Sequence, residues 1–177
     1  MTTTMTMART LATAEQIQRR VREMGKKISE DYAGRTIYAL GVLENAFIFM
    51  ADLVRAIEVP VICQFIRPHT EEQHGSREIF FGPELDVAGR HVLLIEGLVN
   101  SGQTTDFLLR NIASRGAASV KLAAMLDKQT GRTVHLQPDY FGFLINDYVV
   151  GYGLGANDLD RNLPYISTRA GGGSYRS

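Results

Sequence analysis

The stretch from Val92 to Thr105, V-L-L-I-E-G-L-V-N-S-G-Q-T-T, contains the residues best suited to chemistry in this sequence. An apolar run ends in a short turn of small and hydroxylated residues, and a helical pattern follows. Backbone N–H groups of such a turn converge at the start of the helix, where the helix dipole also favours an anion. An ordinary strand–turn–helix connection capped by Ser or Thr has the same pattern, so the segment alone leaves both interpretations open. The candidate phosphate-binding residues are Ser101, Gly102, Gln103, Thr104 and Thr105.

The elements that position this turn follow from the hydrophobic periodicity. Helices are predicted at 14–32, 46–56 and 104–114, and strands at 36–43, 59–65, 91–96, 119–126, 139–144 and 149–150. Residues 67–76 are polar and aperiodic, which predicts an exposed loop, and 78–81 is a candidate strand after it. Strands that alternate with helices predict an α/β fold with a mainly parallel sheet flanked by helices on both faces. Ligands of such sheets bind at the carboxyl ends of the strands, where this turn lies.

Composition narrows the classes of protein that this chain can represent. Its 177 residues suit one domain, and 19 basic residues balance 19 acidic ones, which argues against a nucleic-acid or anionic-membrane partner. The single cysteine, Cys63, lies in a strand-like run and is predicted to be buried in a reducing, cytoplasmic protein. We predict a flexible arm at 1–10, a folded domain at 11–166 and a Gly/Ser-rich disordered tail at 167–177.

Several motifs together resemble one enzyme family. Residues 92–105 resemble the phosphoribosyl pyrophosphate motif of type I phosphoribosyltransferases: an apolar run, E-D, two apolar residues and D-[ST]-G. M-L-D-K at 125–128, V-V-G-Y-G at 149–153 and R-N-L-P-Y-I at 161–166 resemble the hypoxanthine branch of that family. These landmarks occur in the family's order across 11–166. The resemblance implies the type I phosphoribosyltransferase fold, in which a small hood covers the sheet.

The resemblance also implies a role for each matching residue. The turn at 101–105 would hold the 5′-phosphate, and Glu96 with position 97 would hold the ribose hydroxyls. Lys128 would hydrogen-bond the exocyclic oxygen of the purine, Tyr148 would stack on the base, and Val149 would contact the base edge. Residues 44 and 45 with Arg161 would bind pyrophosphate. Taken singly, Lys128 and Arg161 would be read as ordinary surface charges.

Five positions depart from the family pattern, and all five concern chemistry. Gly97 replaces the second carboxylate of the E-D pair, and Asn100 replaces the aspartate proposed as the catalytic base. Gly155 replaces the aspartate that binds magnesium, while Glu44 and Asn45 replace the family's K-G. Because an amide accepts no proton at neutral pH, the loss of a general base alone predicts a rate about 10²–10⁴-fold lower.

We therefore predict a purine nucleotide or 5′-phosphate pocket in a catalytically impaired or non-catalytic protein, such as a sensor, regulator or partner subunit. The alternative is an active transferase of purine salvage that uses phosphoribosyl pyrophosphate and Mg²⁺. Replacement groups from Arg67–Arg77 or from Asp158 and Asp160 are a further possibility, although plain solvated surface is the simpler interpretation. The expected partners are a purine nucleotide or phosphorylated small molecule and, as in the family, further copies of the chain in a dimer or tetramer.

Overall fold

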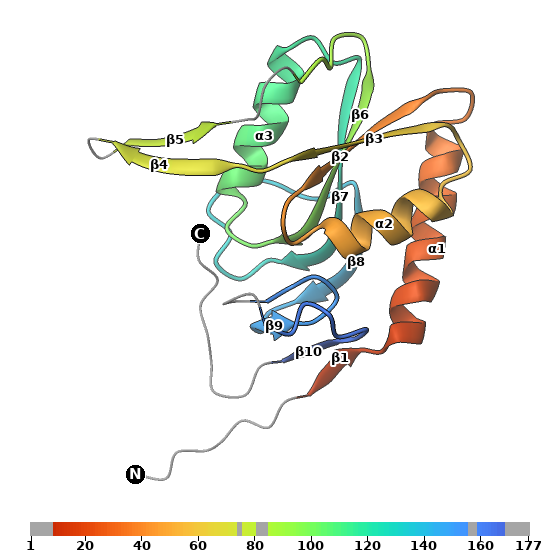
Figure 1. Cartoon of the computed structure of the whole chain (residues 1–177), viewed down its shortest axis with the longest axis vertical. Coiled ribbons are helices and arrows are strands. Elements are labelled where there is room, and N and C mark those ends of the chain that lie inside the picture. Colours follow the sequence, from red (N-terminus) through yellow and green to blue (C-terminus); the bar gives the residue numbers. More distant parts are fainter. Residues whose placement is uncertain (1–8, 74–75, 81–84, 156–158, 169–177) are drawn as a thin grey trace.

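A five-stranded parallel sheet forms the centre of the molecule, with the strand order β3-β2-β6-β7-β8 (Figure 1). The computed structural model describes residues 9–73, 76–80, 85–155 and 159–168. The strands of this sheet are β2 (Ile37–Val42), β3 (Val61–Ile66), β6 (His91–Val99), β7 (Ser119–Lys128) and β8 (Tyr140–Ile145). The parallel sheet predicted from the alternation of strands and helices is confirmed.

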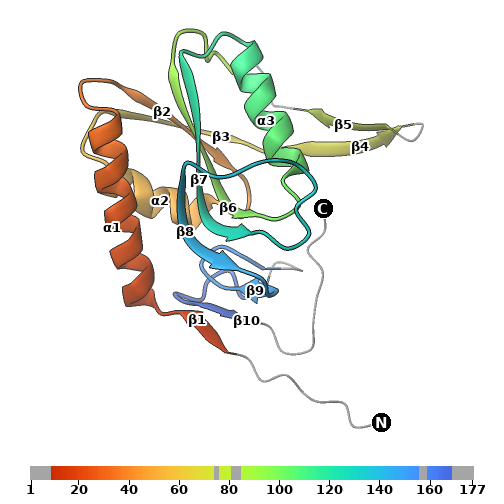
Figure 2. The same ribbon diagram turned by 180° about the vertical axis from the view of Figure 1, so that it is seen from behind.

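Helices cover both faces of this sheet. α1 (Ala14–Asp31) and α2 (Phe47–Ala56) lie on one face, and α3 (Gln103–Ser114) lies on the other (Figures 1 and 2). Strand β2 shows why both faces need cover: Ile37 belongs to the core under α1 and α2, whereas its neighbour Tyr38 belongs to the core under α3. Such strands are buried on both sides and read as continuous apolar runs, as they do in this sequence.

A small antiparallel sheet lies beyond the carboxyl ends of the central strands and forms the hood (Figure 1). It consists of β1 (Thr10–Ala12), β10 (Ile166–Thr168) and β9 (Val149–Val150). The sequence predicts only β9, from its pair of valines, because β1 and β10 are too short to show a period. Thr10, Ser167 and Thr168 therefore belong to paired strands, although the predicted boundaries place them in the arm and the tail. The rest of that arm (1–8) and tail (169–177) lies outside the described residues.

Two further predictions differ from the structure. The segment predicted as a loop at 67–76 contains β4 (His69–Gln73), which pairs antiparallel with β5 (Ser76–Phe80) in a projecting hairpin (Figure 1). The candidate strand at 78–81 overlaps β5, whereas the polar sequence of β4 has no alternation to reveal it. Cys63 is exposed rather than buried, because β3 is an edge strand and four of its six residues face solvent. None of the helices in the described part of the chain is long and apolar enough to cross a bilayer.

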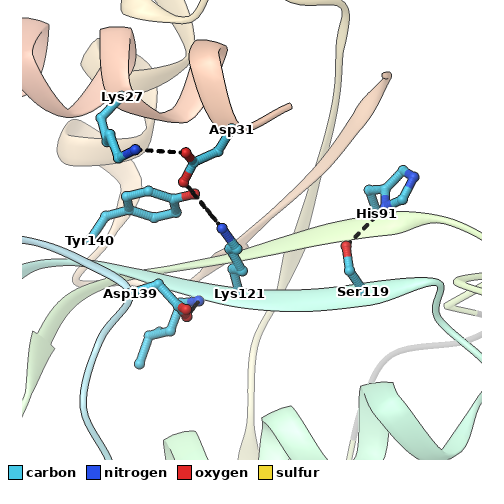
Figure 3. Close-up of polar contacts among 8 residues, drawn as sticks. Lys27, Asp31, His91, Ser119, Lys121, Asp139 and Tyr140 are labelled. Carbon is cyan, nitrogen blue, oxygen red and sulfur yellow. Dashed lines mark hydrogen bonds and ion pairs between the residues drawn. The ribbon is translucent and has the colours of Figure 1, made fainter. Parts of the chain in front are cut away.

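A charged cluster at the amino ends of β7 and β8 attaches α1 to the sheet (Figure 3). The carboxylate of Asp31 accepts hydrogen bonds from Lys27 Nζ (2.8 Å), Tyr140 Oη (2.7 Å) and Lys121 Nζ (3.2 Å). Lys121 Nζ also lies 5.2 Å and 5.5 Å from the ring centroids of Tyr140 and Tyr32. The hydrogen bond from Lys27 and that from Tyr140 hold the pKa of Asp31 well below its ordinary value. This cluster lies at the opposite end of the sheet from the hood and serves the fold.

The change of Asp31 to Asn should lower the free energy of unfolding at pH 7 by about 1–3 kcal/mol, because hydrogen bonds to a charged acceptor are lost. A lowered folded-state pKa contributes stability above the unfolded pKa of about 3.9, and this contribution disappears as the pH falls through the folded value. Urea unfolding at pH 7 and pH 3 should therefore show a smaller difference between wild type and variant at pH 3. The neighbouring exposed Glu30→Gln variant is the control, and an equal loss there would contradict the assignment.

Candidate phosphate-binding site

The turn between β6 and α3 lies at the carboxyl edge of the sheet, where the sequence places it. Gly102 precedes α3 with φ +82°, a left-handed conformation that glycine adopts without strain. The carbonyl of Gly102 accepts from the N–H of Asp106 at 2.8 Å, which begins the helical ladder. Because the first N–H groups of a helix have no acceptor within it, those of residues 103–105 are available at this edge. Gln103 and Thr104 are exposed there, as a ligand site requires.

Arg132 holds the backbone of this turn in place through hydrogen bonds. Nothing in the sequence pattern distinguishes it from a surface arginine. Its Nε donates to the carbonyl of Asn100 (3.0 Å), and its Nη1 donates to the carbonyl of Leu136 (2.6 Å). Its Nη2 donates to the carbonyl of Lys128 (3.0 Å) and pairs with the carboxylate of Asp127. The side chains of Arg132 and Asp127 are only 12% and 4% exposed, so this is a buried ion pair.

The segment that carries Arg132 also packs against the next residues of the turn. The N–H of Thr133 donates to the carbonyl of Ser101 at 3.0 Å. A Cβ on Gly102 would lie 2.8 Å from Val134 Cγ2 and 3.0 Å from Arg132 Cδ, so only glycine fits here. With the carbonyls of Asn100 and Ser101 bound by this segment, the turn has a fixed shape before any ligand arrives. Such preorganisation lowers the cost of binding an anion.

Glu96 lies beside the turn and is held by α3. The hydroxyl of Thr105 donates to Glu96 Oε1 at 2.8 Å, so this hydroxyl serves the carboxyl rather than standing open to a phosphate. Burial raises the pKa of Glu96 to about 7, and the hydrogen bond from Thr105 opposes that rise. Near neutral pH the carboxyl therefore exists in both its protonated and its ionised form. The protonated carboxyl can donate a hydrogen bond, and the ionised carboxyl can only accept one. A hydroxyl group both donates and accepts, so either form of Glu96 can bind it.

The residues predicted to bind pyrophosphate come together at the end of β2. The Leu43–Glu44 peptide bond is cis. The carboxylate of Glu44 lies 2.9 Å from Arg67 Nη2 and 3.7 Å from Arg161 Nη2. Arg161 Nη1 donates to the side-chain oxygen of Asn45 (2.8 Å) and to the carbonyl of Gly153 (3.0 Å). Arg67, which follows β3, is an addition to the predicted set.

Backbone atoms fill the space beside two of the glycines that replace carboxylates. A Cβ on Gly97 would lie 2.2 Å from the carbonyl oxygen of Asn45. A Cβ on Gly155 would lie 2.2 Å from the carbonyl oxygen of Leu159. An aspartate at either position would therefore force the backbone to move, which the sequence alone does not reveal.

We expect the change of Gly97 to Ala to lower the free energy of unfolding by about 1–3 kcal/mol, as overpacking of a filled site does. The displaced group is the Asn45 carbonyl, so chemical shifts of residues 43–46 should change most in an NMR spectrum. Gly34→Ala is the control for the spectrum only: its Cβ would have no atom within 4 Å, but its φ of +73° adds backbone strain to any cost in stability. The 43–46 shifts should not change in Gly34→Ala, and unchanged shifts in Gly97→Ala with a cost below about 0.5 kcal/mol would contradict the contact.

The predicted base-binding residues lie at the same edge of the molecule. Lys128 ends β7, Tyr148 precedes β9, and Val149 is buried in β9. The described residues contain no group of three His, Cys, Asp or Glu side chains arranged to hold a metal ion. Asp160 is exposed, and Asp158 lies outside the described residues.

Comparisons with known proteins agree with this architecture. A family model described as the phosphoribosyl transferase domain matches residues 8–157. The hypoxanthine-guanine phosphoribosyltransferase of Mycobacterium avium is 38% identical over 169 residues, covering 89% of this chain and 83% of that protein. The bifunctional protein TilS/HprT of Listeria monocytogenes is also 38% identical, over 161 residues, but the chain spans only 25% of its length. A solved hypoxanthine-guanine phosphoribosyltransferase from Bacillus anthracis superposes with a TM-score of 0.83 at 33% identity, covering 90% of this chain and 95% of that one.

Proposed function

Because the chain belongs to the phosphoribosyl transferase domain family and is similar to hypoxanthine-guanine phosphoribosyltransferases, we propose that it is a purine phosphoribosyltransferase of nucleotide salvage. In this reaction a purine nitrogen bonds to the anomeric carbon of phosphoribosyl pyrophosphate and gives up its proton, while the bond from that carbon to the pyrophosphate oxygen breaks and pyrophosphate leaves. The products are a nucleoside monophosphate and pyrophosphate. The observation that carries the proposal is the turn at the start of α3, which Arg132 and Thr133 hold ready for a 5′-phosphate.

The proposed roles of the residues follow their places at the edge of the sheet. Backbone N–H groups of residues 103–105 would bind the 5′-phosphate, and Glu96 would bind the ribose hydroxyls. Lys128, Tyr148 and Val149 would bind the purine base. Arg161 and Arg67 would attract the pyrophosphate group.

The sequence favours a non-catalytic protein, and the comparisons support the active alternative better. Relatives at 37–38% identity, of which the chain covers 83–89%, are named as hypoxanthine-guanine phosphoribosyltransferases. The substitutions at the described positions do not by themselves show that activity is lost. We propose that Glu44, Gly97, Asn100 and Gly155 lower the rate of the reaction rather than abolish it.

The described residues do not by themselves form a complete binding site for magnesium. Mg²⁺ is usually bound by one or two carboxylates together with substrate phosphates, and Gly155 provides no carboxylate. The metal would therefore reach the pocket as the counter-ion of the substrate pyrophosphate. The chain's own contribution to charge balance comes from its arginines.

We also propose that the chain forms a homo-oligomer. Ile62 and Phe65 on the edge strand β3 are 41% and 51% exposed, and Phe47 at the start of α2 is 43% exposed. Ile62 and Phe65 point to opposite faces of the sheet, and β3 is an edge strand whose unpaired backbone groups can pair with a second copy of the chain. Light scattering coupled to gel filtration would measure the mass, and a mass of one chain at micromolar concentration would contradict the proposal.

A turnover assay tests the proposed reaction directly. Hypoxanthine, guanine and adenine are each incubated with phosphoribosyl pyrophosphate and Mg²⁺, and nucleotide formation is followed by chromatography. We expect conversion of the 6-oxopurines, because Lys128 would donate to their exocyclic oxygen. Absence of nucleotide from all three bases, with a folded protein, would leave only a binding function for the pocket.

A further inference from the structure

Glu44 joins two arginines that are far apart in the sequence. Its Oε1 lies 2.9 Å from Arg67 Nη2, and its Oε2 lies 3.7 Å from Arg161 Nη2. Each carboxylate oxygen thus faces a different guanidinium group, Arg67 at hydrogen-bond distance and Arg161 as a longer ion pair. Guanidinium groups are common partners of carboxylate and phosphate oxygens. Glu44 carries one negative charge and each arginine carries one positive charge, so these three side chains together have a net positive charge.

The segment that carries Glu44 is held down against the sheet edge. Arg161 binds the Asn45 side chain and the Gly153 carbonyl, while the Asn45 carbonyl fills the space beside Gly97. Asn45 thus packs against β6 just before the turn at 100–102 that leads into α3. The anion-binding arginines and the candidate phosphate-binding turn therefore belong to one edge of the molecule.

We propose that Glu44 is an internal counter-ion that occupies the anion subsite formed by Arg67 and Arg161, so that an incoming pyrophosphate group must displace it. The inference rests on the proposed function, because it assigns this subsite to the pyrophosphate of the substrate. The side chains of Glu44 and Arg67 are 48% and 66% exposed, so solvent screens their pairing and a ligand can replace it. Arg161, at 19% exposure, stays in place through its backbone contact and receives the ligand.

Displacement of Glu44 has two consequences for affinity. The subsite is open for only a fraction of the time, which weakens apparent binding by that fraction. The displaced carboxylate also remains near a polyanion and repels it. Removal of the charge at position 44 should therefore strengthen pyrophosphate binding, whereas removal of a charge at an ordinary surface site should not.

Calorimetry with inorganic pyrophosphate measures this effect without requiring turnover. We expect the Glu44→Gln variant to bind pyrophosphate about tenfold more tightly than wild type. The matched control is Glu58→Gln, an exposed glutamate after α2, which should leave affinity unchanged. In the Glu44→Gln/Arg67→Gln double variant the gain should be largely lost, because half of the subsite is missing.

Equal or weaker binding by Glu44→Gln, or no binding by either protein, would overturn the inference. Tighter binding by Glu44→Gln in a protein without turnover would support the counter-ion and reject the transferase proposal. Turnover together with unchanged pyrophosphate affinity in Glu44→Gln would support the transferase proposal and reject the counter-ion. Where turnover is present, the KM for phosphoribosyl pyrophosphate should fall severalfold in Glu44→Gln with a smaller change in kcat, since a change at the pyrophosphate subsite acts on binding.

Discussion

Replacement of Asn100 by aspartate should raise the rate of nucleotide formation by about 10²-fold or more. Asn100 follows β6 at the edge of the sheet, and the family resemblance places it where a carboxylate would accept a proton from the purine. An amide cannot act as a base at neutral pH, and a positioned base contributes about 10²–10⁴-fold to a rate. The Asn100 carbonyl stays bound to Arg132 in either protein, so the turn keeps its shape. Steady-state kinetics with hypoxanthine would measure the gain in kcat.

The control for this substitution is Asn146→Asp, which adds the same charge at the exposed end of β8. We expect no gain in rate there, because the effect depends on position rather than on net charge. If Asn100→Asp leaves kcat unchanged while the protein remains folded, proton transfer at this position does not limit the reaction. Gly97→Asp offers no comparable gain, since its side chain would collide with the Asn45 carbonyl.

The second large effect concerns stability. The change of Arg132 to Met should lower the free energy of unfolding by about 3–5 kcal/mol, because it leaves the buried Asp127 carboxylate without its partner. The same change frees the carbonyls of Asn100 and Leu136 from their donor, so binding of any 5′-phosphate should weaken as well. Urea unfolding measures the first effect, and calorimetry with a nucleotide measures the second.

Two further variants test whether the loss of stability comes from the buried ion pair rather than from the loss of any surface charge. Arg110 pairs with Asp106 at 2.9 Å in α3, and its side chain is 80% exposed, so Arg110→Met should cost about 0.5 kcal/mol or less. The Arg132→Met/Asp127→Leu double variant should be more stable than Arg132→Met alone, because no unpaired charge remains. A cost below about 1 kcal/mol for Arg132→Met would contradict its role as the support of the turn.

The sequence predicts the central fold well because each central element has a period or a continuous apolar run. Helix α1 shows this, since Ile17, Val21, Met24 and Ile28 recur at helical spacing and all are buried. Strand β6 shows it too, with its four apolar residues after His91 buried from both faces of the sheet. The short strand β1 and the polar strand β4 lack either signal, so they appear only in the structure.

The residues of the candidate site also fall into two groups, those that the sequence predicts and those that only the structure reveals. The turn at 101–105 and the meeting of Glu44, Asn45 and Arg161 follow from motif and topology. Arg132 does not, because a buried arginine in a loop has the same sequence signature as a surface one. The sequence does not predict the packing around Gly97 either, since its neighbours come from distant segments. The contacts of Arg132 with the Asn100 carbonyl and of Gly97 with the Asn45 carbonyl join distant segments, so no local pattern encodes them.

Isothermal titration calorimetry with inosine monophosphate and with inosine tests the central claim, that the turn at the start of α3 binds a 5′-phosphate. The two ligands differ only in that phosphate, so their difference in affinity reports on the turn alone. We predict that the monophosphate binds at least about 100-fold more tightly than the nucleoside, consistent with several charge-assisted hydrogen bonds. Equal affinity, or no binding of the monophosphate at millimolar concentration, would contradict this account of the site.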